Sequence, residues 1–402
     1  MCPYHRYVTP RHGTTLRDLG PRHGRAHRAG WFWRSVGLTT TAVLAFGASA
    51  SSYFAYTAMS NMNQIRPNSY VDAGDRPPVD PAAGNSLNIL LIGSDDRSGE
   101  NGVIGGVDPT LDNTMRSDTT IVMHISSDRK RVEMVSIPRD SLVKIPSCTT
   151  TRGKTKAEND AMFNKAFANG WDRGGDIDSA VACTIVAVEA NTGLRIDHSV
   201  VVDFAGFQRM VDAVHGVNLC LEHPMKDSKY TGLDLPAGPQ HLNGVQALQF
   251  ARARHVTGSD GSDTSRIDRQ QQLMGALAQE VLSKNVLKDG RGLAKFVDAA
   301  TESLSLDITP RTIIGLAYSM RNIDTSKIVF TTIPFVNEGN RVRWTSQADV
   351  VWKAMAKDQS VADALNPPAP TPKPGEKVQP TPAPTQVVTV DQMQADSQVC
   401  AS

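Results

Sequence analysis

The stretch "TTIVMHISSDRKRVEMVSIP", residues 119–138, decides the fold of this chain. Isoleucine, valine and methionine recur in both of its halves, and the polar segment "SDRK" at 127–130 separates them. Short apolar runs bounded by turn residues are typical of buried strands, and so short a connection joins antiparallel neighbours. The sequence therefore predicts a β-hairpin here, and "LNILLIG" at 87–93 predicts a further strand of the same kind.

Helical patterns follow these strands along the chain. The segment "SAVACTIVAVEANTG" at 179–193 ends in a glycine that suits a helix C-cap. The segment "FAGFQRMVDAVHG" at 204–216 repeats apolar residues at helical spacing before its own final glycine. Strands mixed with helices in this order predict an α/β (α+β) sandwich, in which helices flank a central mixed β-sheet.

The hairpin also predicts a charged rim at one edge of the sheet. With the turn near residues 128–129, Asp118 lies ten positions before it and Arg139 ten after it, so the two should face each other at the open end. If the strand at 87–93 runs parallel to the second hairpin strand, its end "GSDDR" at 93–97 reaches the same edge. The charged residues that would then meet are Asp95, Asp96, Arg97, Arg116, Asp118, Arg139 and Asp140.

Two interpretations of this rim are open. The charges could form mutual surface salt bridges, each of which contributes little to stability. Alternatively, the aspartates hold a hard cation such as Mg²⁺, which favours one or two carboxylates together with phosphate oxygens, while the arginines bind the remaining phosphate charge.

A second group of arginines lies in "FARARHVTGSDGSDTSRIDRQQ", residues 250–271, and consists of Arg252, Arg254, Arg266 and Arg269. The spacing predicts that one helix ends near Arg254 and that another includes "SRIDRQQQLMGALAQEVL". On the second helix, one continuous stripe joins Arg266, Gln270, Leu273, Leu277 and Val281. Because burying an unpaired arginine is costly, Arg266 should meet an acid or an anionic ligand.

The N-terminus predicts a membrane anchor. Residues 1–35 carry seven arginines against the single acid Asp18, and residues 36–58 contain no charge. About 20 such residues suffice for a helix to span a bilayer. The positive-inside rule then keeps residues 1–35 in the cytoplasm and places the rest of the chain outside the cell membrane. A cleaved signal peptide is the alternative, because "ASA" at 48–50 resembles a cleavage site, although the apolar stretch continues past it.

The remaining chain divides by composition. A linker is expected over 59–85, where "RPPVDPAAG" occurs, then one folded domain over 86–360, and a proline-rich disordered tail over 361–402. The 42 basic residues nearly balance the 41 acidic ones, which argues against a protein held to nucleic acid by bulk charge.

The cysteines fit an exported domain. Cys2 would be cytoplasmic and Cys400 lies in the tail, so an oxidising exterior allows one disulfide among Cys148, Cys183 and Cys220. We favour the pair Cys148 and Cys183.

Seven segments, read in order, resemble the motifs of the LytR-CpsA-Psr family, especially of its actinobacterial members. They cover roughly residues 86–284 and read "LLIGSDDR", "RSDTTIV", "VEMVSIPRDS", "FNKAFANG", "TGLRIDHSVVVDFAGFQRMVDAVHGV", "LNGVQALQFARAR" and "SRIDRQQ". Any one of them would be weak evidence. Seven in the right order make the resemblance specific.

The resemblance implies a membrane-anchored phosphotransferase of the cell envelope. Such enzymes are thought to move a glycopolymer, with one phosphate, from a polyprenyl-pyrophosphate carrier onto a hydroxyl of peptidoglycan. By the same resemblance, Asp95 and Asp118 match the acids that hold Mg²⁺ (or Mn²⁺), and these two with Arg139 and Arg254 are the catalytic candidates. The pyrophosphate-binding set would comprise Arg97, Arg116, Arg139, Arg252, Arg254, Arg266, Arg269 and Gln270.

Three points stay open at this level. Asp118 and Asp140 are both candidates for the base that accepts the proton of the attacking hydroxyl. Hydrolysis of the pyrophosphate, or a non-catalytic role as a scaffold for the lipid carrier or an attenuator of transcription, are the alternatives to transfer. Relatives often carry a cysteine in the "LPAG" loop that could pair with Cys220, but Pro239 stands at that place, so Cys220 is expected to be unpaired.

Overall fold

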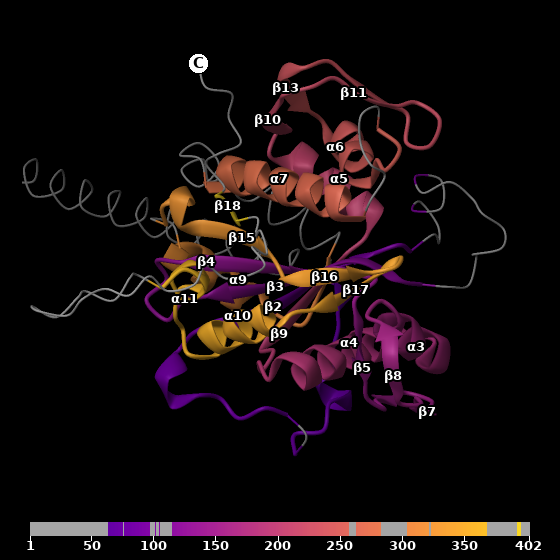
Figure 1. The fold of residues 1–402 in the computed structure, drawn as a ribbon, viewed down its shortest axis with the longest axis vertical. Coiled ribbons are helices and arrows are strands. Elements are labelled where there is room, and N and C mark those ends of the chain that lie inside the picture. The colour runs from indigo at the N-terminus through magenta and orange to yellow at the C-terminus, as the bar shows by residue number, and fades with distance from the viewer. Residues whose placement is uncertain are drawn as a thin grey trace, which may run out of the picture. The chain divides into compact units, whose positions relative to one another are not determined.

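An eight-stranded sheet runs through the middle of the structure (Figure 1). The sheet is mixed, because β2 pairs parallel with β9 and antiparallel with β3. In spatial order its strands are β1 (Asn63–Gln64), β14 (Leu304–Leu306), β9 (His198–Val202), β2 (Leu87–Ser94), β3 (Ser117–Ile125), β4 (Val132–Ile137), β15 (Ile328–Thr332) and β18 (Gln392–Gln394).

This computed structural model describes residues 63–74, 76–96, 101, 104, 115–256, 263–282, 304–320, 323–367 and 392–394. All of them belong to one unit, Ala58–Ser402. No helix within these ranges is long and apolar enough to cross a membrane. The predicted span at 36–58 lies outside the described residues.

The predicted hairpin is present as β3 and β4. Thr120 pairs with Ile137 and Ile125 with Val132, so the register brings Asp118 opposite Arg139 at the open end. Because β2 pairs antiparallel with β3, it runs in the same direction as β4, and its C-terminal end reaches the same edge. Both geometric conditions for the charged rim are therefore met.

The two faces of the sheet are covered by different helices, which confirms the predicted sandwich. On one face, Leu90, Val122 and Val135 pack in a core with residues of α4 and α10. On the other face, Ile89, Ile121 and Met134 pack with residues of α7 and α9. The helices of these two layers are α3 (Lys165–Gly174), α4 (Ile177–Thr192), α10 (Ser346–Ala356) and α11 (Val361–Leu365) on the first, and α7 (Asp263–Leu282) and α9 (Pro310–Met320) on the second.

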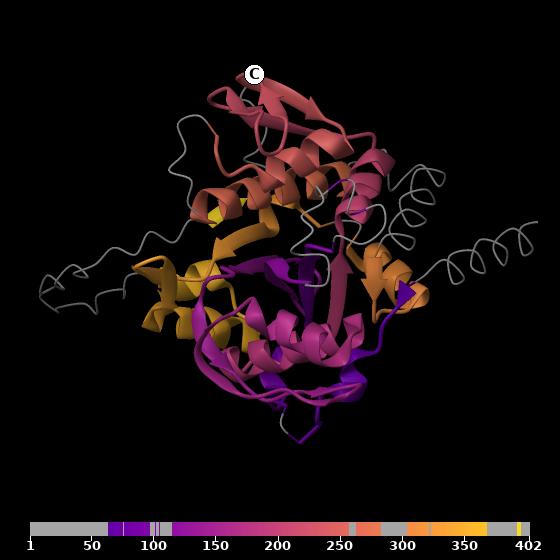
Figure 2. The ribbon, with the colours of Figure 1, turned by 90° about the vertical axis from the view of Figure 1, so that its right-hand side faces the viewer.

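A smaller lobe with a core of its own lies beyond α7 (Figure 2). The lobe joins the main body through Leu273, Ala276 and Leu277 of α7. At Gly244 a Cβ atom would lie 2.3 Å from the carbonyl oxygen of Gln208, so only glycine lets α6 approach α5 this closely. The elements of the lobe are α5 (Phe204–Ala213), β10 (Val217–Leu221), β11 (Met225–Asp227), β12 (Leu233–Leu235), β13 (Gly238–Leu242) and α6 (Gly244–Arg252).

Helix ends follow the capping signals in the sequence. Gly193 is the left-handed C-cap of α4, as predicted, with φ of 66°. Asn243 caps α6 in a reciprocal capping box with Gln246. The remaining short strands form two-stranded pairs at the periphery: β5 (Leu142–Ile145) with β8 (Glu158–Met162), β6 (Thr149–Thr150) with β7 (Gly153–Lys154), and β16 (Phe335–Glu338) with β17 (Arg341–Trp344).

The predicted boundary between linker and domain needs correction. Part of the expected linker, 59–85, is folded onto the domain, because β1 pairs with β14 and the side chain of Ile65 is buried. Arg76 also forms a 2.6 Å ion pair with Glu189 of α4. A two-residue strand is too short to produce a recognisable sequence pattern, and the surrounding prolines masked it.

The start of the expected tail, 361–402, also needs correction. Val361–Leu365 form α11, which begins with a hydrogen bond from the backbone of Asp363 to the side chain of Ser360. Val361 itself is buried in the main core. Further along, Gln392–Gln394 pair antiparallel with β15 as the last strand of the sheet.

The favoured disulfide is confirmed, since Cys148 and Cys183 are bonded with their Cα atoms 5.2 Å apart. The expectation that Cys220 is unpaired is wrong, because Cys220 is disulfide-bonded as well. Its neighbour across the β10–β13 ladder is indeed Pro239, so the expected local partner is absent.

A buried charged cluster holds the C-terminal segment at the turn end of the hairpin. Nε2 of His124 lies 3.1 Å from Oδ1 of Asp358, and Arg131 donates to the same carboxylate over 2.9 Å. Glu133 accepts the backbone N–H of Val361 at the start of α11 over 2.9 Å. Burial raises the pKa of Glu133 to about 7, although that hydrogen bond and Arg131 oppose the rise.

This cluster predicts a pH-dependent stability. Between pH 4.5 and about 7 the folded protein keeps a proton on Glu133 that the unfolded chain has lost, so the free energy of unfolding falls as pH rises through that interval. Glu133→Gln keeps an acceptor for Val361 without a charge and should remove this fall, which makes the variant more stable above pH 7, by at most on the order of 3 kcal/mol. Denaturant unfolding at several pH values measures the difference.

Comparing wild type with Glu133→Gln also controls for the pH dependence of stability that His124 contributes. Burial lowers the pKa of His124, so its contribution to stability is lost as pH falls, which is the opposite sign to that of Glu133. Because both proteins contain His124, its contribution cancels in their difference. Parallel profiles for wild type and Glu133→Gln between pH 4.5 and 7 would contradict the prediction.

Candidate functional site

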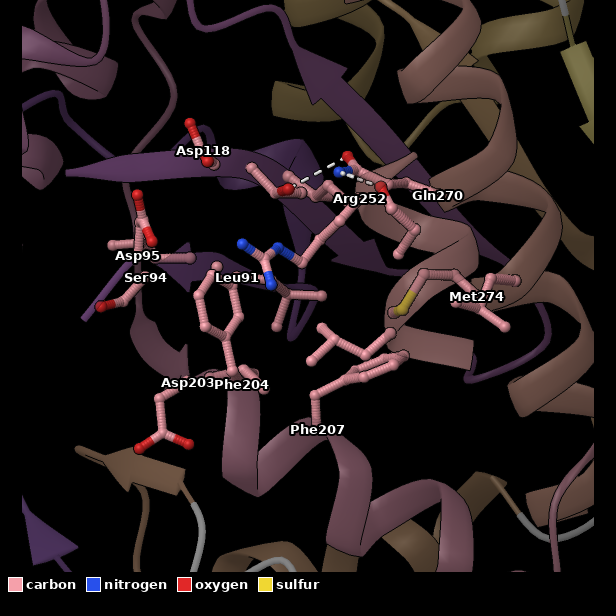
Figure 3. Close-up of a pocket in the computed structure, with 18 of the residues that line it drawn as sticks. Leu91, Ser94, Asp95, Asp118, Asp203, Phe204, Phe207, Arg252, Gln270 and Met274 are labelled. Atoms are coloured by element: carbon pink, nitrogen blue, oxygen red, sulfur yellow. Dashed lines mark hydrogen bonds between the residues drawn. The ribbon is translucent and has the colours of Figure 1, made fainter. Parts of the chain in front are cut away.

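A cavity of about 590 Å³ opens between the sheet, α5, α6 and α7 (Figure 3). Most of its wall is apolar. Strands β2, β3, β9 and β14 and helices α5, α6 and α7 supply Leu91, Ile92, Ile121, Val200, Val202, Phe204, Phe207, Met210, Leu248, Ala251, Leu273, Met274, Leu277 and Leu304. Such a wall suits a long hydrocarbon chain, which makes van der Waals contacts along its length and needs no hydrogen bonds.

The polar end of the cavity is the rim predicted from the hairpin. Asp95 follows β2, and Arg139 follows β4 on the far side of β3. Arg139 donates from Nη1 to Oδ1 of Asp118 over 2.8 Å, and both side chains are half-buried. Asp95 donates its backbone N–H to the carbonyl of Arg116 over 2.9 Å, which holds the ends of β2 and β3 together.

Helices α6 and α7 contribute the other polar groups. Arg252 is the last residue of α6 and Arg254 follows two residues later. Arg266 and Gln270 come from the first half of α7. Arg266 is 3% exposed and donates to the backbone carbonyl of Asp118 over 3.2 Å. Gln270 is oriented by the hydroxyl of Thr119, which donates to its Oε1 over 3.0 Å.

The predicted stripe on α7 is confirmed. Arg266, Gln270, Leu273 and Leu277 all line the cavity, so the arginine at the head of the stripe lies at the junction of the polar and apolar parts. Four cationic side chains besides Arg266 share the cavity, namely Arg116, Arg139, Arg252 and Arg254. The predicted set Asp95, Arg116, Asp118, Arg139, Arg252, Arg254, Arg266 and Gln270 therefore meets in one place.

Arg269 does not belong to this set in the structure. It is 8% exposed, is not part of the cavity wall, and donates to the backbone carbonyl of Ala253 at the end of α6. Its position one residue before Gln270 turns it to another face of the helix, toward the α6–α7 junction. Arg97, the other predicted neighbour, lies outside the described residues.

The structure also distinguishes the two candidates for the base, Asp118 and Asp140. Asp118 lines the cavity, whereas Asp140 lies outside its wall, with Oδ2 3.7 Å from Nε of Arg139. The geometry favours Asp118.

The rim fits a hard cation. Asp95 and Asp118 are two carboxylates at one edge, which is the protein share that Mg²⁺ takes when phosphate oxygens complete its coordination. Ser94 beside them is 3% exposed, and its hydroxyl has no hydrogen-bond partner among the residues that the structure describes. Within the described ranges, no three His, Cys, Asp or Glu side chains cluster closely enough to enclose a metal by themselves, so phosphate or water would have to supply the other ligands.

Sequence reasoning missed several residues of the wall. Ser94, Thr119, Asp203, Phe204 and Phe207 all line the cavity. The two phenylalanines stand three positions apart in "FAGFQRM", a spacing that places them on one face of a helix but does not distinguish a cavity wall from an ordinary core.

The sequence profile of the LytR_cpsA_psr family matches residues 50–359, which is most of the chain. The chain belongs to the LytR-CpsA-Psr family.

Relatives within this family carry cell-wall names. The chain is 32% identical over 269 residues to the cell wall biosynthesis protein LcpA of Corynebacterium glutamicum, covering 63% of this chain and 51% of LcpA. It is 30% identical over 245 residues to the polyisoprenyl-teichoic acid–peptidoglycan teichoic acid transferase TagU of Oceanobacillus iheyensis, covering 61% of this chain and 67% of TagU. The chain spans about half the length of LcpA and of the related LcpB.

Solved structures share the fold. A LytR-Csp2A-Psr enzyme from Actinomyces oris superposes with a TM-score of 0.52 at 20% identity, over 75% of this chain and 98% of that one. TagV of B. subtilis superposes with a TM-score of 0.50 at 24% identity, over 70% of this chain and 97% of that one. Both likenesses support a mixed α/β architecture with a central sheet.

The different positions of Arg254 and Arg269 predict that removing Arg254 affects ligand binding, whereas removing Arg269 affects the stability of the fold. Arg254→Ala should weaken binding of geranyl pyrophosphate by roughly 10- to 100-fold, because it removes a charged donor from the cavity. Arg269→Ala should leave that affinity close to wild type and lower the free energy of unfolding by about 1–3 kcal/mol, because a buried carbonyl loses its donor. Titration calorimetry and denaturant unfolding measure the two quantities, and a larger binding loss for Arg269→Ala would contradict this assignment.

Proposed function

We propose that this protein transfers a glycopolymer, with one phosphate, from a polyprenyl-pyrophosphate carrier to a hydroxyl of peptidoglycan. The observation that carries this proposal is the cavity, which joins a long apolar wall to a rim of five arginines. A polyprenyl pyrophosphate has the same two parts, because an apolar chain ends in a diphosphate diester. The name of TagU, a transferase of polyisoprenyl-linked teichoic acid to peptidoglycan, supports the same substrates and acceptor.

The arginines would bind and polarise the pyrophosphate. Phosphoryl transfer needs little covalent help from a protein, so positioning and stabilisation of the growing charge on the leaving phosphate carry most of the catalysis. Arg266 is already buried at the junction, and Arg252 and Arg254 approach from α6. Asp95 and Asp118 would hold Mg²⁺ (or Mn²⁺), which supplies further positive charge to the phosphate oxygens.

The transfer step is a displacement at phosphorus. The oxygen of the acceptor hydroxyl attacks the phosphorus that bears the sugar, and the bond from that phosphorus to the bridging oxygen breaks. Polyprenyl phosphate leaves with the electron pair. The hydroxyl proton passes to a carboxylate at the rim. Of the two candidates, Asp118 and Asp140, we assign this role to Asp118, because it lines the cavity and Asp140 does not.

The proposed topology follows from the charge pattern of the N-terminus. Residues 1–35 would lie in the cytoplasm, residues 36–58 would span the cell membrane once, and the folded domain would lie outside the cell. This arrangement gives the domain access to the membrane that carries the lipid and to peptidoglycan. The confirmed disulfide between Cys148 and Cys183 supports an oxidising location.

A transfer assay tests the proposal. The purified protein is incubated with a labelled polyprenyl-pyrophosphoryl oligosaccharide and peptidoglycan, with Mg²⁺ or with EDTA. We expect label in peptidoglycan for wild type, and a loss of about 10²- to 10³-fold for Arg139→Ala and Arg254→Ala, since each removes a charge that stabilises the leaving phosphate. Arg341→Ala, on β17 and outside the cavity wall, is the matched arginine control and should transfer like wild type.

The products separate the alternatives. Phosphate release without transfer to peptidoglycan would identify a pyrophosphate hydrolase. Tight binding of the lipid with neither product would identify a scaffold for the carrier, and equal activity with EDTA would overturn the role of the cation.

A further inference from the structure

The cavity contains one contact whose purpose the pyrophosphate site does not by itself explain. The guanidinium carbon of Arg252 lies 4.4 Å from the centroid of the Phe204 ring, and both residues line the cavity (Figure 3). Within the described part of the chain, the only other cation over an aromatic ring is Lys229 on Tyr230, which is not part of the cavity wall. Phe207, one turn later on α5, lines the cavity without such a contact.

The contact with Phe204 is not a conventional hydrogen bond. The ring attracts the cation through its quadrupole, and the guanidinium carbon lies 4.4 Å from the ring centroid. The N–H groups of the guanidinium are the donors that match phosphate oxygens. One N–H of Arg252 donates to the carbonyl of Ile104 over 3.3 Å, which further restricts rotation of the plane.

The backbone on each side of Phe204 is itself held in place. Asp203 is the N-cap of α5 and accepts the N–H of Gly206 over 2.6 Å. Its other carboxylate oxygen accepts a hydrogen bond from Nδ2 of Asn101 over 3.0 Å. Asn101 is buried and accepts the N–H of Ala205 over 2.8 Å. The residues before and after Phe204 are thus both bonded to Asn101.

We propose that Phe204 is a positioning residue for Arg252: its ring holds the guanidinium at the junction of the apolar wall and the charged rim, with its N–H plane turned toward the phosphates of the lipid carrier. This proposal rests on the proposed function. A long arginine side chain loses much rotamer freedom when it binds an anion, and a cation–π contact that exists beforehand reduces that loss. The ring therefore contributes to affinity for the anion, in addition to lining the cavity for the chain.

Two probes separate these contributions. Inorganic pyrophosphate reports on the charged rim alone, and geranyl pyrophosphate reports on the rim together with the apolar wall. Phe204→Leu keeps an apolar side chain but removes the ring, and should weaken both probes by a similar factor of roughly 2- to 30-fold. Phe204→Tyr keeps a ring and should restore affinity to within about twofold of wild type.

Phe207→Leu is the matched comparison on the same helix. Because no cation of the described residues lies over the ring of Phe207, its replacement should weaken binding of geranyl pyrophosphate by a larger factor than binding of inorganic pyrophosphate. An Arg252→Gln background supplies the second comparison, since Phe204→Leu should there cost no further affinity for inorganic pyrophosphate. Calorimetric titration of all variants, with thermal unfolding to verify that each is folded, completes the measurement.

The outcomes are distinguishable. If wild type binds both probes and Phe204→Leu behaves like Phe207→Leu, or lowers affinity equally with and without Arg252, then Phe204 only lines the cavity and the positioning role is overturned while the proposed function stands. If wild type binds neither probe, the pyrophosphate site itself is absent, and both proposals fail.

Discussion

The register between β3 and β4 is the constraint on which the rest of the structure depends. Pairing of Thr120 with Ile137 fixes the open end of the hairpin, where Asp118 and Arg139 form a 2.8 Å ion pair. Pairing of Ile125 with Val132 fixes the turn end, where His124 and Glu133 hold the C-terminal segment. A slip of one residue would move Asp118 out of register with Arg139 and would shift His124 relative to Glu133, so both ends would be disrupted at once.

The cavity exists because the sheet is sandwiched between unequal layers. On one face, α4 and α10 pack directly against the strands in a continuous core. On the other face, α7 packs against the sheet with Met274 and Ala278 while Leu273 and Leu277 belong to the core of the smaller lobe. One helix thus serves two cores, and the space between them remains open to a ligand. The lobe packs on α7 through these contacts, and it brings Arg252 and Arg254 to a rim built by strands far away in sequence.

Much of the site could be predicted because its residues are placed by the direction of neighbouring strands and by the spacing of residues along a helix. Strand direction alone brought Asp95, Asp118 and Arg139 to one edge, and helical spacing alone put Arg266 and Gln270 on the cavity stripe. The prediction for Arg269 had no such rule to rely on, and none pointed to Phe204 or Phe207 as part of the cavity wall. Arg269 satisfies a carbonyl at the end of another helix, and which helix lies there is decided by packing. The same holds for Ile65, whose buried place in the core no local pattern indicated.

The sequence by itself determined the sandwich of sheet and helices, the meeting of acids with arginines at one rim, and the family to which the chain belongs. These follow from strand periodicity, from helical spacing and from the order of the motifs along the chain. For the cysteines it allowed one disulfide among Cys148, Cys183 and Cys220, and the structure bonds the favoured pair, Cys148 and Cys183. Only the tertiary structure decided that the arginines close one end of an apolar cavity, that the guanidinium of Arg252 lies over the ring of Phe204, and that Arg269 faces away. Those contacts join residues from separate elements, and their geometry depends on how the layers pack, which no stretch of sequence encodes alone.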